Sequence, residues 1–146
     1  IIETIRCYEL PTTLIEVELT ESALVYGIDA ATEIIQSLRT QGIRVALDDF
    51  GSGYSSLGYL KELPLDSLKI DREFVRDIDQ NPVNATIVQA ITTMAKALHL
   101  RVIAEGIETA AQLERIRACG CDEGQGYHFS RPLPAEEFAK LLRPTP

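Results

Sequence analysis

The stretch IRVALDDFGSGYSSL (residues 43–57) indicates the fold class of this chain and contains part of its candidate site. Residues 43–48 form a β-rich run, and two acidic residues, Asp48 and Asp49, stand where that run ends. Neighbouring side chains of an ideal strand point to opposite faces. Asp48 and Asp49 can therefore face one site only if the backbone leaves strand geometry there. The glycines that follow, in residues 50–53, supply that freedom.

Short β-like runs alternate with helical stretches on both sides of this segment. Strands are predicted at residues 15–20, 43–48, 65–70, 101–105 and 123–129. Helices are predicted at 29–41, after the N-cap pair Asn81-Pro82, after a capping box of Thr109 and Gln112, and at 134–142. This alternation predicts an α/β fold with a parallel sheet and helices on its faces. About five strand–helix units fit the chain, which leaves a small open sheet and the C-terminal part of a barrel as alternatives.

Length, charge and cysteine content restrict the class of protein. The 146 residues fit one domain, and no apolar run is long enough to span a bilayer. The net charge of −8 excludes duplex nucleic acid as a partner and leaves room for a small phosphate ligand bridged by metal cations. The three cysteines do not have the spacing of a zinc site or of a redox-active pair. They therefore indicate reduced thiols in a cytoplasmic protein. The start lacks Met and a signal pattern, so we expect a piece of a longer chain.

Polar residues recur at the C-terminal end of each predicted strand. Parallel α/β folds build their sites at this edge of the sheet. Each acidic residue taken alone could instead be a solvated surface charge or a helix N-cap. Their recurrence strand after strand favours a shared site, whose candidates are Glu18, Glu21, Asp48, Asp49, Lys69, Asp71, Glu105, Glu108 and Gln125.

Four of these candidates, namely Glu18, Asp48, Asp49 and Glu105, are hard oxygen donors without His or Cys at ligand spacing. Such donors suit Mg²⁺ or Mn²⁺. Two such ions would clamp a phosphodiester and activate water for in-line displacement. Lys69 could orient the water or offset charge that develops on phosphate. Its alternative is a salt bridge with Asp66 or Asp71.

The same residues carry a resemblance to a known family. Five ordered motifs span almost the whole chain and resemble the EAL domain, the bacterial cyclic di-GMP phosphodiesterase module; they are ELTES (18–22), DDFGSGYSSL (48–57), LKID (68–71), AEGIET (104–109) and QGY (125–127). The resemblance implies a modified TIM barrel, of which residues 1–146 form the C-terminal part. Ser52 stands where the family more often has Thr, and the Glu-Ala-Leu motif with its metal-binding Glu is expected before residue 1, as is a metal-binding Asn.

The resemblance also implies roles for individual residues. Glu18 and Asp48 would bind the first metal ion, and Asp48, Asp49 and Glu105 the second. Lys69 would position the nucleophilic water, and Glu105 is also assigned as a general base. A last group would contact substrate or support the site: Gln125 and Asp71 as substrate-binding residues, Glu21 as the anchor of the loop after Asp49, and Glu108 as a support near the second metal.

We therefore expect a Mg²⁺- or Mn²⁺-dependent hydrolase that opens cyclic di-GMP to linear pGpG in bacterial second-messenger and biofilm signalling. The family implies a homodimer through this domain. It also implies sensor or GGDEF domains upstream, through which the parent protein could be anchored to a membrane. Two alternatives stay open: a catalytically inactive EAL-type receptor of cyclic di-GMP, and an enolase-type barrel enzyme with Lys69 as its base.

Overall fold

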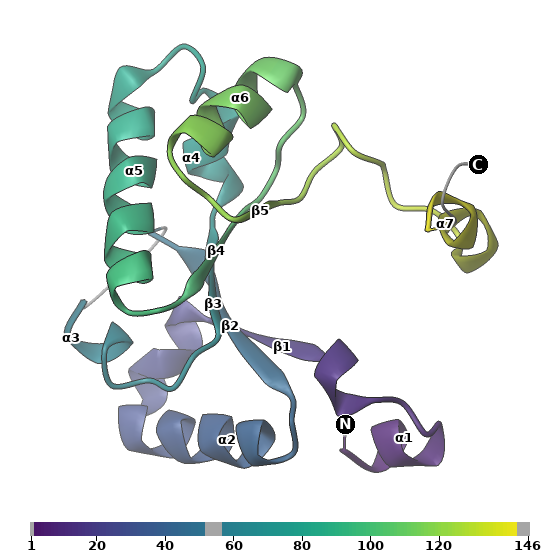
Figure 1. The fold of residues 1–146 in the computed structure, drawn as a ribbon. Helices are drawn as coiled ribbons and strands as arrows, with labels where there is room; N and C mark the ends of the chain where they lie inside the picture. Colours follow the sequence, from purple (N-terminus) through teal and green to yellow (C-terminus); the bar gives the residue numbers. More distant parts are fainter. Residues whose placement is uncertain (1, 52–56, 143–146) are drawn as a thin grey trace.

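The computed structural model describes residues 2–51 and 57–142, and its centre is a five-stranded parallel sheet (Figure 1). The strands follow one another in space as they do in sequence, β1-β2-β3-β4-β5. They are β1 (Glu16–Thr20), β2 (Arg44–Phe50), β3 (Ser67–Ile70), β4 (Arg101–Ala104) and β5 (Glu123–Gly124). Parallel neighbours in sequence order are what successive strand–helix units produce, so the predicted α/β class is confirmed.

Helical segments precede the first strand, connect the strands and follow the last one. They are α1 (Ile2–Cys7), the 3₁₀ helices η1 (Thr12–Leu14) and η2 (Glu21–Tyr26), α2 (Ile28–Thr40), α3 (Leu57–Leu60), α4 (Arg72–Arg76), α5 (Pro82–Ala97), α6 (Ala110–Ala118) and α7 (Ala135–Leu141). Asn81 caps α5 by accepting hydrogen bonds from two backbone N–H groups. Thr109 and Gln112 form the predicted capping box of α6. Helices α3 and α4 are too short to leave a hydrophobic period in the sequence, and neither was predicted.

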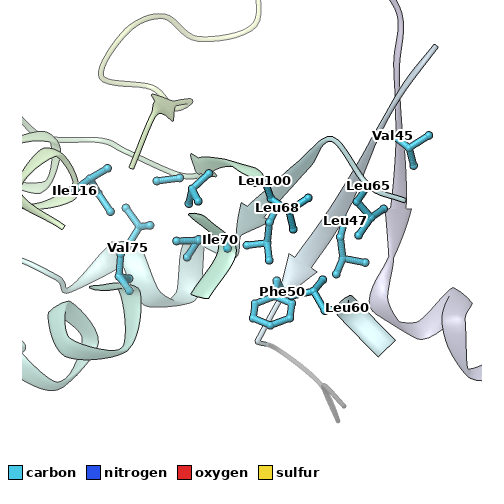
Figure 2. Close-up of a cluster of buried hydrophobic side chains, with 14 of the residues drawn as sticks. Val45, Leu47, Phe50, Leu60, Leu65, Leu68, Ile70, Val75, Leu100 and Ile116 are labelled. Atoms are coloured by element: carbon cyan, nitrogen blue, oxygen red, sulfur yellow. The ribbon is translucent and has the colours of Figure 1, made fainter. Parts of the chain in front are cut away.

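One face of the sheet forms the hydrophobic core. Val45 and Leu47 of β2 and Leu68 and Ile70 of β3 are alternate residues of their strands, and all four are almost fully buried (Figure 2). They pack in one cluster with apolar residues of the covering helices, namely Ile35 of α2, Val75 of α4, Val88 of α5 and Ile116 of α6. Burying such a side chain stabilises the fold by about 1.5–3 kcal/mol. The core thus fixes the register that brings the strand ends together.

The opposite face of the sheet carries polar and charged residues. Glu16 of β1 accepts hydrogen bonds from Ser67 of β3 and from Arg101 of β4, at 3.1 and 2.8 Å. Arg101 also donates to Glu123 of β5 at 2.6 Å. In a flat sheet β1 and β4 would lie roughly 14 Å apart. Their direct contact therefore indicates that the sheet is strongly curved, with the charged face on its concave side, as a barrel segment requires.

The last strand is shorter than predicted. A strand was expected over residues 123–129, but β5 contains only Glu123 and Gly124. The chain turns around Ile107, whose N–H donates to the carbonyl of Gln125 and whose carbonyl accepts from the N–H of His128. At Gly126 a Cβ atom would overlap the main chain of Ile107. This long-range contact ends the strand, and α7 lies apart from the other helices (Figure 1).

In the ranges 2–51 and 57–142, no helix combines the length and apolar character that a membrane span requires. The three cysteines are free thiols.

Candidate functional site

The backbone departs from strand geometry at the end of β2. Asp49 has φ +55°, a left-handed conformation that is uncommon for residues other than glycine and is better tolerated by Asp and Asn. The pairing of β2 with β3 shifts register between Leu47 and Phe50. The expected break is therefore present; it begins at Asp49 itself and continues at Gly51, which has φ +98°. It frees consecutive residues from the strict alternation of a strand.

The consequence of this break is a cluster of carboxylates. Asp48, Asp49 and Glu105 each place one carboxylate oxygen within 4.8 Å of the others. Partial burial, followed by the negative charges of Asp48 and Asp71, raises the pKa of Asp49. Burial also raises the pKa of Glu105, and its hydrogen bond with Lys69 opposes this without cancelling it. Both pKa values are thus raised mainly by burial, and the neighbouring carboxylates at the carboxyl ends of the strands raise them further.

Lys69 of β3 lies at the centre of this cluster. Its side chain is only 5% exposed, and its ammonium lies 2.5 Å from Glu18 Oε1 and 2.6 Å from Glu105 Oε1. Asp48 Oδ1 is 3.4 Å away, without the geometry of a hydrogen bond. Burial lowers the pKa of Lys69, but the hydrogen bonds to Glu105 and Glu18 outweigh it, and the pKa lies above its ordinary value. In place of the sequence-based alternative, a bridge to Asp66 or Asp71, the structure shows partners from β1, from β2 and from the residue after β4.

The donors present fit a hard divalent cation. Asp48 Oδ1 is buried and has no hydrogen-bond partner among the described residues. A buried carboxylate oxygen without a partner is costly unless a cation or water satisfies it. With Asp49 and Glu105 beside it, this oxygen belongs to an all-carboxylate set of the kind that Mg²⁺, Mn²⁺ and Ca²⁺ prefer.

The remaining predicted residues lie outside the carboxylate cluster, in what we call its rim. Asp71 caps α4 by accepting from the N–H of Glu73 and lies close enough to Asp49 to raise its pKa. Glu108 is exposed and lines a cavity of about 520 Å³ together with Asp71. Gln125 is exposed, and its main chain bonds to Ala104. None of the three belongs to the carboxylate cluster, although Asp71 adjoins it through Asp49.

Glu21 begins η2, and both of its carboxylate oxygens are buried without a hydrogen-bond partner in the part of the chain that the structure describes. Its expected role is to anchor the loop after Asp49. Residues 52–56 of that loop lie outside the described residues, and with them the substitution at position 52. The anchoring role of Glu21 therefore stays a prediction.

Gln112 holds the loop between β4 and α6. From the sequence, Gln112 was predicted only as part of the capping box of α6. Its side chain accepts from the N–H groups of Glu108 and Thr109 and donates to the carbonyl of Arg76 in α4. Gly106 has φ +73°, and a Cβ atom there would come 2.5 Å from the side chain of Arg72. The loop that begins with Glu105 is thus fixed against α4. No sequence signal announces the contact with α4, because it joins residues 36 positions apart.

Fold and site together define a segment of a β/α barrel with a carboxylate cluster and a buried lysine at the carboxyl ends of its strands. The family model of the EAL domain matches residues 1–132. The chain belongs to the EAL domain family.

Similar proteins agree with this assignment. The chain is 48% identical over 134 residues to the cyclic di-GMP phosphodiesterase NbdA of Pseudomonas aeruginosa. This match covers 92% of this chain and 17% of that protein. The solved PaMucR phosphodiesterase in complex with c-di-GMP superposes with a TM-score of 0.87 at 40% identity, covering 93% of this chain and 55% of that one. Klebsiella pneumoniae BlrP1, solved with manganese and cyclic di-GMP, has a TM-score of 0.82 at 32% identity. The match covers 89% of this chain and 33% of that one. The chain thus spans under a fifth of the relative NbdA and about half of the PaMucR structure.

Proposed function

We propose that the full-length protein is a phosphodiesterase that hydrolyses cyclic di-GMP to linear pGpG with two divalent cations, Mg²⁺ or Mn²⁺. The observation that carries this proposal is the convergence of Asp48, Asp49 and Glu105 beside the buried Lys69. A related phosphodiesterase and a related structure that contains manganese and cyclic di-GMP support it.

The carboxylates are assigned as cation ligands. We assign Glu18 and Asp48 to one cation, and Asp48, Asp49 and Glu105 to the other. When bound, the cations supply the positive charge and the polarisation that an in-line displacement at phosphorus needs. Asp71 and Gln125 are assigned to substrate contact, while Glu21 and Glu108 support the surrounding loops. The parts of the site upstream of residue 1, including the family's Glu-Ala-Leu motif, are expected to complete the ligand set.

Lys69 acts through its charge rather than as a base. Its pKa lies above the ordinary value, so it keeps its proton at neutral pH. An ammonium at this place orients an attacking water and stabilises negative charge that grows on the phosphate oxygens. Glu105, whose pKa is raised, is the better proton acceptor of the two. This division of roles disfavours the enolase-type alternative, which needs a neutral Lys69.

The test is direct hydrolysis by the full-length protein. Cyclic di-GMP is incubated with Mn²⁺ or with EDTA, and the products are separated by ion-pair chromatography. We expect pGpG with Mn²⁺ and none with EDTA. Tight binding of cyclic di-GMP without any product would favour the alternative of a non-catalytic receptor. The proposal also includes homodimerisation, which sedimentation tests, and additional sensor or GGDEF domains, which the sequence of the complete gene tests. It further includes a cytoplasmic location, which cell fractionation tests.

A further inference from the structure

A single ammonium group contacts three carboxylates, two of the cluster and that of Glu18 beside it. Lys69 Nζ lies 2.5 Å from Glu18, 2.6 Å from Glu105 and 3.4 Å from Asp48. These three carboxylates come from β1, from the residue after β4 and from β2. An ammonium has three N–H donors and no acceptor. Lys69 can therefore face all three carboxylates at once.

We propose that Lys69 is a positioning residue that serves as the built-in cation of the site: it holds Glu18, Asp48 and Glu105 together and weakens their hold on divalent cations. This inference rests on the metal site proposed above. It concerns binding and goes beyond the role of Lys69 in turnover.

The first half of the inference follows from like charges at close range. Asp48, Asp49 and Glu105 place oxygens within 4.8 Å of one another, and Glu18 meets the same ammonium. Charges of one sign repel strongly when they are shielded from water. Lys69 supplies the opposite charge at their centre, and its side chain is 5% exposed, so solvent screens it little. With neither this ammonium nor a bound cation in place, the carboxylates are expected to move apart.

The second half follows from competition for the same oxygens. Asp48 and Glu105 contact Lys69 and also belong to the group that could hold a metal ion. The Glu105 oxygen that accepts a hydrogen bond from Lys69 at 2.6 Å cannot direct the same lone pair at a cation. The ammonium also repels a dication bound to the shared carboxylates. Lys69 thus lowers metal affinity while it keeps the ligands in place.

A second lysine provides a matched control. Lys96 of α5 is also ion-paired, with Asp122 at 3.2 Å, and it donates to the carbonyl of Gly120. Its side chain is 46% exposed, and neither partner belongs to the carboxylate cluster. Lys96→Met therefore removes one lysine charge and one ion pair without touching the candidate site.

The experiment measures Mn²⁺ binding to the full-length protein by isothermal titration calorimetry, without substrate. We expect Lys69→Met to lower the Kd for Mn²⁺ by at least about tenfold, and Lys96→Met to leave it within about threefold. We also expect Lys69→Met to lower the Tm more in EDTA than in saturating Mn²⁺, because Mn²⁺ replaces the lost charge. If Lys69→Met does not fold, Lys69→Gln removes the same charge and keeps an N–H donor.

The outcomes separate this inference from the function on which it rests. Wild-type protein that binds Mn²⁺ with an affinity that the Lys69 variants leave unchanged or weaken overturns the inference and leaves the metal site standing. Wild-type protein that binds no Mn²⁺ overturns both. An equal gain in affinity for Lys96→Met also overturns the inference, because the effect would then be one of net charge alone.

Discussion

The replacement Gln112→Ala tests whether the loop after Glu105 is held as the structure indicates. The side chain of Gln112 is buried, with 6% of the residue exposed. It makes three hydrogen bonds to the main chain: to the N–H of Glu108 at 2.7 Å, to the N–H of Thr109 at 3.0 Å and to the carbonyl of Arg76 at 2.7 Å. Alanine removes all three and leaves the main-chain groups without these partners.

The magnitude follows from these contacts. Each hydrogen bond contributes a net of about 1 kcal/mol. We therefore expect Gln112→Ala to lower the free energy of unfolding by about 3 kcal/mol. Because the freed loop begins at Glu105, the affinity for Mn²⁺ should fall as well.

Urea unfolding of the full-length protein, followed by far-UV circular dichroism, measures this loss. The matched control is Gln89→Ala in α5, because Gln89 is exposed and, in the described ranges, the hydrogen bond found for it uses its main-chain carbonyl. We expect the control to change the free energy of unfolding by less than about 0.5 kcal/mol. A loss below about 1 kcal/mol for Gln112→Ala would refute the view that this side chain fixes the loop.

Three further predictions concern the cluster itself, each in the full-length protein. Asp48→Asn removes a buried ligand charge and should abolish hydrolysis of cyclic di-GMP while circular dichroism stays unchanged; wild-type turnover would exclude Asp48 as a ligand. Lys69→Ala should lower kcat by about 10²–10³, the usual cost of losing one preorganised charge contact, while equilibrium dialysis still detects bound cyclic di-GMP; an equal loss of affinity would make Lys69 a ground-state binding residue. At the left-handed position 49, Asp49→Asn should leave stability in EDTA nearly unchanged and Asp49→Ala should lower it by about 1 kcal/mol, as urea titration will show; identical stability of the two variants would contradict the conformational argument.

Local signals predicted the parts of the fold that depend on nearby residues. The cap residues Asn81 and Thr109 correctly placed the starts of α5 and α6, because a cap interacts only with the first turn of its helix. The break at the end of β2 was predicted for a similar reason, since two consecutive acids cannot face one site from an ideal strand.

Long-range packing determined what the sequence could not predict. The last strand stops at Gly124 because the chain after it folds around Ile107, far upstream. The partners of Lys69 are distant in sequence: Glu18 lies in β1 and Glu105 directly follows β4, and the sheet rather than sequence proximity brings them to Lys69. The roles expected for Gln125 and Glu108 stay predictions, because both side chains lie at the rim, outside the carboxylate cluster.

The central claim is that Asp48, Asp49 and Glu105 bind a divalent cation. Anomalous diffraction from crystals of the full-length protein grown with Mn²⁺ tests it most directly, because the signal locates manganese without reference to activity. The account predicts an anomalous peak about 2.1 Å from carboxylate oxygens of these three residues, which disappears in Asp48→Asn crystals. Well-ordered carboxylates without an anomalous peak beside them, or manganese found only elsewhere in the protein, would contradict the claim.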